Sequence, residues 1–201
     1  MVKKTMLAAA LVIGGVTGAW AQNGAAPFGI AMGTPKSQLG PVTDASVSEQ
    51  MFKLPTVPRP HPDLESYIVQ ATPRTGVCFV KGVGKTFQTS VYGSEVQKHF
   101  NDLKEQLEAV YGPSKVYDTL MPGSIWNEPK DFMMGMVKKE RFLAASWNRD
   151  TKHALPASLQ EIGVVATALS TNSAYVSVEF YGTNTAACEA DVKAGKQNAF
   201  K

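Results

Sequence analysis

The residues of this chain whose types could support chemistry are two cysteines, three histidines and one Gly-Lys-Thr triplet. The triplet at residues 84–86 ends like a phosphate-binding loop, but the spacing of such a loop requires a glycine where this chain has Phe79. His61, His99 and His153 have no short paired spacing and belong to no Cys/His cluster. The sequence therefore predicts no metal site and no cofactor.

The sequence carries no catalytic signature either. No G-x-S-x-G segment is present, although that segment marks the nucleophile of many hydrolases. A catalytic triad is recognised by geometry and not by sequence position, so a hydrolase with a convergent active site stays open as an alternative. We expect a protein that is not an enzyme, and we assign no catalytic residue.

The two cysteines predict a disulfide. Cys78 and Cys188 allow only one intramolecular pairing, and no C-x-x-C motif or adjacent histidine or aspartate favours a reactive thiol. The bridge would close a loop of about a hundred residues and stabilise the fold by roughly 2–5 kcal/mol. It would join the middle of the chain to its C-terminal part.

Tryptophan and arginine residues in the second half indicate a binding surface. Trp and Arg dominate the energetics of protein interfaces, and Trp126, Arg141, Trp147 and Arg149 lie within one short region. The alternative is that both tryptophans are core aromatics at the ends of elements. We take these four residues as the candidate binding site.

The first 21 residues have the three parts of a cleavable signal peptide. Lys3 and Lys4 form a basic region, residues 6–16 are uncharged and mostly apolar, and residues 19–21 read Ala-Trp-Ala. The apolar run is shorter than the ~20 residues that a spanning helix needs, and no cysteine near the cut could carry a lipid. We expect cleavage after Ala21, a periplasmic or secreted location and no stable membrane anchor.

Composition and charge argue against a disordered protein and against a nucleic-acid-binding protein. The 201 residues are 44% hydrophobic and 18% charged, which is typical of a globular protein and not of a disordered one. The formal net charge is +3, and two of the lysines lie in the signal peptide, so the excess of basic residues in the mature chain is one. We therefore expect no nucleic-acid partner.

The pattern of apolar residues divides the chain into four segments. Residues 1–21 are the signal peptide, 22–65 hold a short helix and a proline-rich connector, 66–194 form the globular domain, and 195–201 are a tail. The globular part also allows two similar halves that meet near residue 113, although no residue-level repeat is found.

Periodicity places the elements that would position these side chains. Strands are predicted at 67–71, 77–80, 87–92, 142–147, 162–169 and 175–181. Ser94 and Gln97 predict a capping box for a helix whose apolar side chains recur through Val96, Phe100 and Val110. A shorter helix is predicted after Pro129, and a helical turn at 185–194 carries Cys188. Grouped strands with intervening helices predict an α+β fold, an antiparallel β-sheet with helices packed on one face.

One N-terminal stretch resembles a group of known proteins. The segment from Phe28 to Pro35, followed by Leu39 and Gly40, is similar to the opening of small envelope proteins built from a helix pair and antiparallel strands, such as outer-membrane assembly lipoproteins and secreted enzyme inhibitors. The resemblance implies an envelope partner and no particular site residue.

Together these observations predict an exported protein that binds another envelope component, as an adaptor or an inhibitor, with its oligomeric state left open. The alternatives are the periplasmic or secreted hydrolase and a small-ligand carrier that uses a pocket between sheet and helix.

Overall fold

The computed structural model describes residues 25–149, 155–198 and 200. The predicted signal peptide and His153 lie outside the described residues. Within these ranges, no helix is both long enough and apolar enough to cross a bilayer.

Nine strands form one antiparallel sheet in the spatial order β1-β2-β3-β4-β9-β8-β7-β6, and the short β5 pairs with the start of β9. Their bounds are β1 (Thr43–Ser46), β2 (Met51–Leu54), β3 (Leu64–Thr72), β4 (Gly76–Gly84), β5 (Phe87–Gln88), β6 (Lys115–Leu120), β7 (Arg141–Asn148), β8 (Leu159–Ser170) and β9 (Ser173–Gly182). The pairing of β4 with β9 sets Val80 opposite Phe180 and so joins distant parts of the chain.

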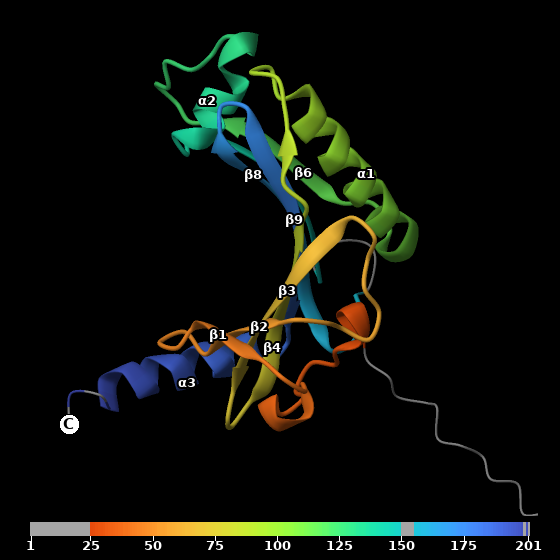
Figure 1. Cartoon of the computed structure of the whole chain (residues 1–201), viewed down its shortest axis with the longest axis vertical. Coiled ribbons are helices and arrows are strands. Elements are labelled where there is room, and N and C mark those ends of the chain that lie inside the picture. The colour runs from red at the N-terminus through yellow and green to blue at the C-terminus, as the bar shows by residue number, and fades with distance from the viewer. Residues whose placement is uncertain (1–24, 150–154, 199, 201) are drawn as a thin grey trace, which may run out of the picture.

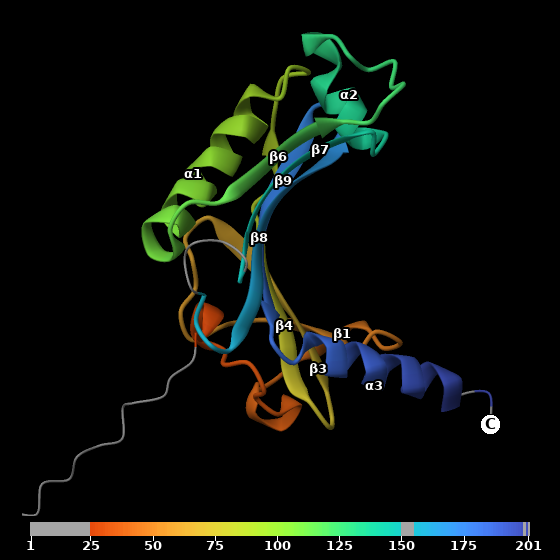
Figure 2. The same ribbon diagram turned by 180° about the vertical axis from the view of Figure 1, so that it is seen from behind.

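Three α-helices and three 3₁₀ turns complete the fold, and the helices lie on both sides of the sheet. Their bounds are η1 (Pro27–Gly29), η2 (Lys36–Gln38), α1 (Ser94–Tyr111), η3 (Pro129–Asp131), α2 (Phe132–Val137) and α3 (Thr185–Asn198). Figures 1 and 2 show α1 and α3 on opposite sides of the sheet, with α3 projecting from the end formed by β1–β4.

A single hydrophobic core lies against the face that α1 covers. Phe100 of α1 and Met133 of α2 are buried in it, together with alternate residues of the strands. Trp147 of β7 has no exposed surface, and its indole N–H donates to the Gly112 carbonyl at 2.7 Å, just after α1. This hydrogen bond ties the end of α1 to the sheet beneath it.

The α+β class with an antiparallel sheet is confirmed, as are the strand positions from β7 to β9 and the short helix after Pro129. The helices do not all pack on one face as expected, because α3 lies on the other side of the sheet from α1. The predicted capping box at Ser94 is wrong: Gly93 precedes the helix with φ 68°, and the Glu95 carboxylate instead accepts from the Ser90 N–H and the Thr89 hydroxyl, each at 2.9 Å. These hydrogen bonds, that of the Ser90 N–H first, lower the pKa of Glu95 to about 2.

Other sequence-based expectations also need correction. Val110 is 71% exposed and so lies outside the buried face of α1, which consists of Val96, Phe100 and Leu103. The short helix expected after Pro35 is the single 3₁₀ turn η2, and Pro35 precedes it instead of forming its first residue. Residues 22–65 also contain β1 and β2, which the pattern of apolar residues does not predict.

Trp147→Phe should lower the free energy of unfolding by about 2–4 kcal/mol, because it removes a buried hydrogen bond and leaves a cavity. Urea denaturation followed by far-UV circular dichroism measures this change. Trp126→Phe is the matched control, because Trp126 is only partly buried and lies outside the core cluster. Equal losses in the two variants would contradict the role given to Trp147.

Candidate functional site

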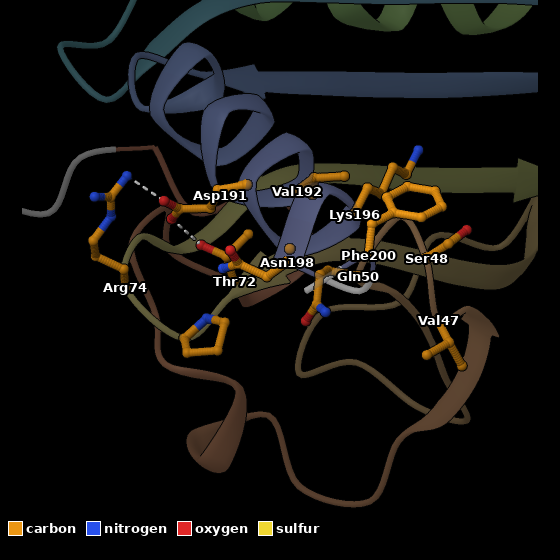
Figure 3. Close-up of a pocket in the computed structure, with 13 residues that line it drawn as sticks. Val47, Ser48, Gln50, Thr72, Arg74, Asp191, Val192, Lys196, Asn198 and Phe200 are labelled. Carbon is orange, nitrogen blue, oxygen red and sulfur yellow. Dashed lines mark hydrogen bonds and ion pairs between the residues drawn. The ribbon is translucent and has the colours of Figure 1, made fainter.

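One hollow lies between α3 and the turns at one end of the sheet, and we call it the α3 groove. It has a volume of about 850 Å³. The turn between β1 and β2, the turn between β3 and β4 and the last two turns of α3 line it. Figure 3 shows Asp191 directed toward Arg74 and Thr72 at one end of the groove, with Lys196 and Phe200 at the other.

Asp191 connects α3 to the β3–β4 turn. Its Oδ2 accepts hydrogen bonds from the Thr72 hydroxyl at 2.7 Å and from the Thr75 hydroxyl at 2.6 Å, while its Oδ1 pairs with the Arg74 guanidinium. The Thr75 hydroxyl, the Thr72 hydroxyl and then Arg74 hold the pKa of Asp191 below its ordinary value of 3.8. Asp191 is therefore an ionised anchor for the helix.

The first turn of α3 is attached by a covalent bond and by polar contacts. Cys78 of β4 and Cys188 of α3 form a disulfide with an S–S distance of 2.03 Å. The Asn184 side-chain amide donates to the Val77 carbonyl at 3.0 Å, and the Thr185 hydroxyl lies 3.0 Å from the Cys78 carbonyl. The predicted cross-link is confirmed, and it fixes the start of the helix that borders the groove.

The groove combines apolar walls with charged ends. Val47 and Val192 supply apolar surface, while Arg74 and Lys196 place cationic groups at the rim. Lys196 also pairs with Glu49 of the β1–β2 turn. This combination suits an amphipathic small molecule, because ligand pockets are mostly apolar with a few orienting polar groups.

A second hollow, the Arg141 cleft, has a volume of about 290 Å³ and lies at the opposite end of the sheet. The Arg141 guanidinium pairs with the Asp118 carboxylate at 2.7 Å and lies 4.4 Å from the centre of the Phe132 ring. Tyr92 and Glu128 also line this cleft. Arg141 is thus held by a carboxylate on one side and an aromatic face on the other.

The structure brings together two of the four predicted binding residues. Trp126 and Arg141 flank Gly135 of α2, where an added Cβ would lie 3.6 Å from the Trp126 Cβ and 3.2 Å from the Arg141 Cβ. The lack of a side chain at Gly135 therefore lets the β7 strand and the Trp126 loop approach α2 closely. Both residues retain partial exposure.

The other two residues lie elsewhere. Trp147 has no exposed surface and so offers none to a partner. Arg149 lies at the other end of β7 from Arg141, and its guanidinium donates to the Leu159 carbonyl at 3.1 Å and the Ala157 carbonyl at 2.6 Å. It supports the connection into β8.

Of the histidines, the structure describes His61 and His99, and no serine is among their hydrogen-bonding, ion-pair or stacking partners. His61 Nε2 lies 2.9 Å from Gln106 Oε1, and the His99 ring stacks on Phe87 with centroids 4.1 Å apart. Within the described residues, no three His, Cys, Asp or Glu side chains group as metal ligands. Neither arrangement supplies a recognisable nucleophile and base.

Sequence reasoning did not find the Asp191 anchor. The hydroxyl groups that Asp191 accepts from are 119 and 116 residues earlier in the chain, so no local spacing relates them. The only local signal is the polar turn at residues 72–75, which reads Thr-Pro-Arg-Thr and presents two hydroxyls and a cation together.

Comparisons of the chain with protein-family models, with curated proteins and with solved structures find no match. The geometry of the two hollows and of the surfaces around them is therefore the basis for assigning a function.

Asp191→Asn should reduce the pH dependence of stability. Because the folded-state pKa of Asp191 is lowered, its ionised form favours folding above pH 4, and this contribution disappears as the pH falls through the folded-state value. Urea midpoints at pH 6 and pH 3 should therefore differ more for the wild type than for Asp191→Asn. Asp44→Asn, which changes an exposed carboxylate in β1, is the matched control. An equal acid response in wild type and Asp191→Asn would refute the anchor.

Proposed function

We propose that this protein is an exported, non-enzymatic binding protein that acts on another envelope protein as an adaptor or inhibitor. The supporting observation is an exposed apolar surface around the edge strand β6, which we call the β6 surface. We define it by the exposed side chains of β6, the loop after it and their neighbours: Tyr92, Val116, Tyr117, Met121, Ile125 and Phe142. Exposed apolar side chains that gather in one region mark interaction sites more often than chance.

The β6 surface has the composition of a protein interface. Ile125 is 74% exposed, Tyr92 is 53% exposed and Val116 is 49% exposed, so a partner could bury much apolar area there. Trp126 and Arg141 border the same region and belong to the residue types that carry most binding energy. The Arg141 cleft, which the exposed Tyr92 lines, supports partner binding at this end of the sheet.

The positions of these side chains are well defined. Thr119 lies opposite Phe142 and Tyr117 opposite Ala144 in the β6–β7 ladder, so Tyr117 and Phe142 share one face of the sheet. Residues on a paired strand lose little conformational freedom when a partner binds, which reduces the entropic cost of association.

An exported location is supported from two directions. The first 21 residues have the pattern of a cleavable signal peptide. The Cys78–Cys188 disulfide is typical of proteins in oxidising compartments such as the periplasm or the cell exterior. The proposed partner is accordingly a protein of the same compartment.

Photo-cross-linking at Ile125 in living cells, followed by purification of the captured protein, tests this function. Ile125→Asp should weaken binding of the purified partner by about tenfold or more, because a charge would be buried against apolar surface. Val110→Asp is the matched control, since Val110 is 71% exposed but lies at the end of α1. Equal weakening by both variants, or no partner at Ile125, would refute the proposal.

A second candidate function is a carrier of a small amphipathic molecule, supported by the α3 groove between helix and sheet. Native mass spectrometry of protein purified from its compartment should then detect a bound molecule. Gly195→Leu should displace this molecule, because Gly195 lines the groove and the leucine side chain would occupy space inside it. The fold has room for this substitution, since an added Cβ at Gly195 meets no atom within 4 Å.

Ala187→Leu is the control for the carrier test, because Ala187 is exposed on α3 and is not among the groove-lining residues. A molecule retained equally by both variants would place it outside the groove. Wild-type protein that carries no molecule would count against the carrier function.

A further inference from the structure

The two edges of the sheet differ in how open they are to another strand. At one edge, β1 is four residues long and its register with β2 is irregular between Asp44 and Ser46, which are features that discourage further pairing. At the other edge, β6 pairs with β7 in unbroken register over its six residues. Within the described parts of the chain no strand pairs with the outer side of β6, which Figure 2 shows at the upper end of the sheet.

The backbone groups at this edge can be assigned from the ladder. The Met121 N–H donates to the carbonyl of Glu140, its opposite residue, at 2.7 Å, which makes this a hydrogen-bonded pair. Hydrogen-bonded and non-hydrogen-bonded pairs alternate along antiparallel strands, so Val116, Asp118 and Leu120 belong to non-hydrogen-bonded pairs. Their backbone N–H and C=O groups therefore point away from β7. Three successive donor and acceptor sets therefore lie along the free edge.

The side chains of the same three residues form one row. Val116, Asp118 and Leu120 alternate with the residues of the opposite face, and Asp118 in the middle of the row lines the Arg141 cleft. Asp118 Oδ1 pairs with Arg141, yet the Asp118 side chain is 42% exposed and can accept further hydrogen bonds. Glu128, whose carboxylate is 60% exposed and pairs with Lys130 Nζ at 2.8 Å on the surface, adds a second carboxylate to the lining of this cleft.

This row favours a particular sequence in an added strand. Directly opposed residues of antiparallel strands share a face, so apolar side chains would lie beside Val116 and Leu120, and a basic side chain would lie beside Asp118. The cleft would hold the basic group near two carboxylates, and the exposed Tyr92 ring could contact its alkyl stem.

The same row disfavours a second copy of this chain as the added strand. Pairing of β6 with itself about Asp118 would set two carboxylates opposite each other, and pairing about Tyr117 would set Asp118 opposite Val116. The row contains no basic residue. A strand from a different protein therefore fits this edge better.

We propose that the β6 surface binds its partner by strand addition, taking up an extended segment with a central lysine or arginine flanked at every second position by apolar residues. This inference rests on the proposed function and specifies the kind of partner. The segment would form an antiparallel strand beside β6 and place its basic side chain in the Arg141 cleft.

Synthetic peptides test the proposal on the wild-type protein. The probe is a fluorescein-labelled peptide, Thr-Val-Thr-Lys-Thr-Val-Thr with blocked ends, and the readout is fluorescence anisotropy. It should bind about tenfold or more tightly than the peptide with glutamate in place of lysine, because Asp118 and Glu128 would repel the acid. Equal affinities, or no binding of the lysine peptide, would overturn the proposal.

N-methylated peptides test the backbone contacts. The lysine and both valines would face the outward groups of β6, whereas the threonine N–H groups would point away. Methylation of the lysine amide nitrogen should therefore weaken binding by about tenfold or more, and methylation of the adjacent threonine nitrogen should weaken it much less. Equal effects of the two methyl groups would rule out strand addition.

Variants of the protein separate this inference from the proposed function. Val116→Pro removes an outward N–H, which an edge strand tolerates, and Val116→Thr keeps that N–H as the matched control. The partner captured at Ile125 should bind Val116→Pro about tenfold more weakly than Val116→Thr, and thermal unfolding should show both variants folded. Equal binding by the two variants would overturn strand addition while the Ile125 result stood. Dimers of the wild-type chain that Val116→Pro dissociates would overturn it in favour of a second copy.

Discussion

The pairing of β4 with β9 is the contact on which the rest of the fold depends, because it joins β1–β4 to the strands that carry α1 and α2. This pairing brings the chain into close contact at Gly84, where an added Cβ would lie 2.3 Å from the carbonyl oxygen of Val176 in β9. The two segments are about a hundred residues apart, so the loop-closure entropy that opposes their pairing is substantial.

The disulfide acts at this same junction. Cys78 lies in β4, and Cys188 lies in the helix that follows β9 directly, so the covalent bond and the strand pairing close nearly the same loop. The apolar anchorage of α3 is small, since Cys188 and Val192 are the buried residues of that helix. Its position therefore depends mainly on the disulfide and on the Asp191 contacts, and so does the shape of the α3 groove.

The sequence predicted best those elements that have one buried face. In β7, Leu143, Ala145 and Trp147 alternate with more exposed residues, and that alternation is what a sequence pattern detects. The edge strands β1 and β6 have no such alternation, because nearly all of their side chains are exposed. The full length of α3 was also missed, because a helix with so little buried surface has a weak apolar period.

The candidate site could be predicted only in part. Trp and Arg content directed attention to Trp126, Arg141, Trp147 and Arg149 alike, but residue type alone could not separate a surface tryptophan from a core one. Alternation could have done so for Trp147, which shares the buried row of Ala145. The contacts of Asp191 depend on the completed sheet, and no reading of local sequence supplies them.

The two candidate sites lie at opposite ends of one continuous sheet, and this separation affects what the protein can do. The α3 groove depends on contacts of β3, β4 and the C-terminal helix, whereas the β6 surface depends on β6, β7 and the loop that follows β6. A strand added beside β6 would extend the ladder away from α3 and would touch no residue of the groove. Occupation of one site therefore leaves the other accessible, and any coupling between them would have to pass through β8 and β9, whose paired strands resist small rearrangements. The geometry favours two independent sites over a single site shared between the two ends.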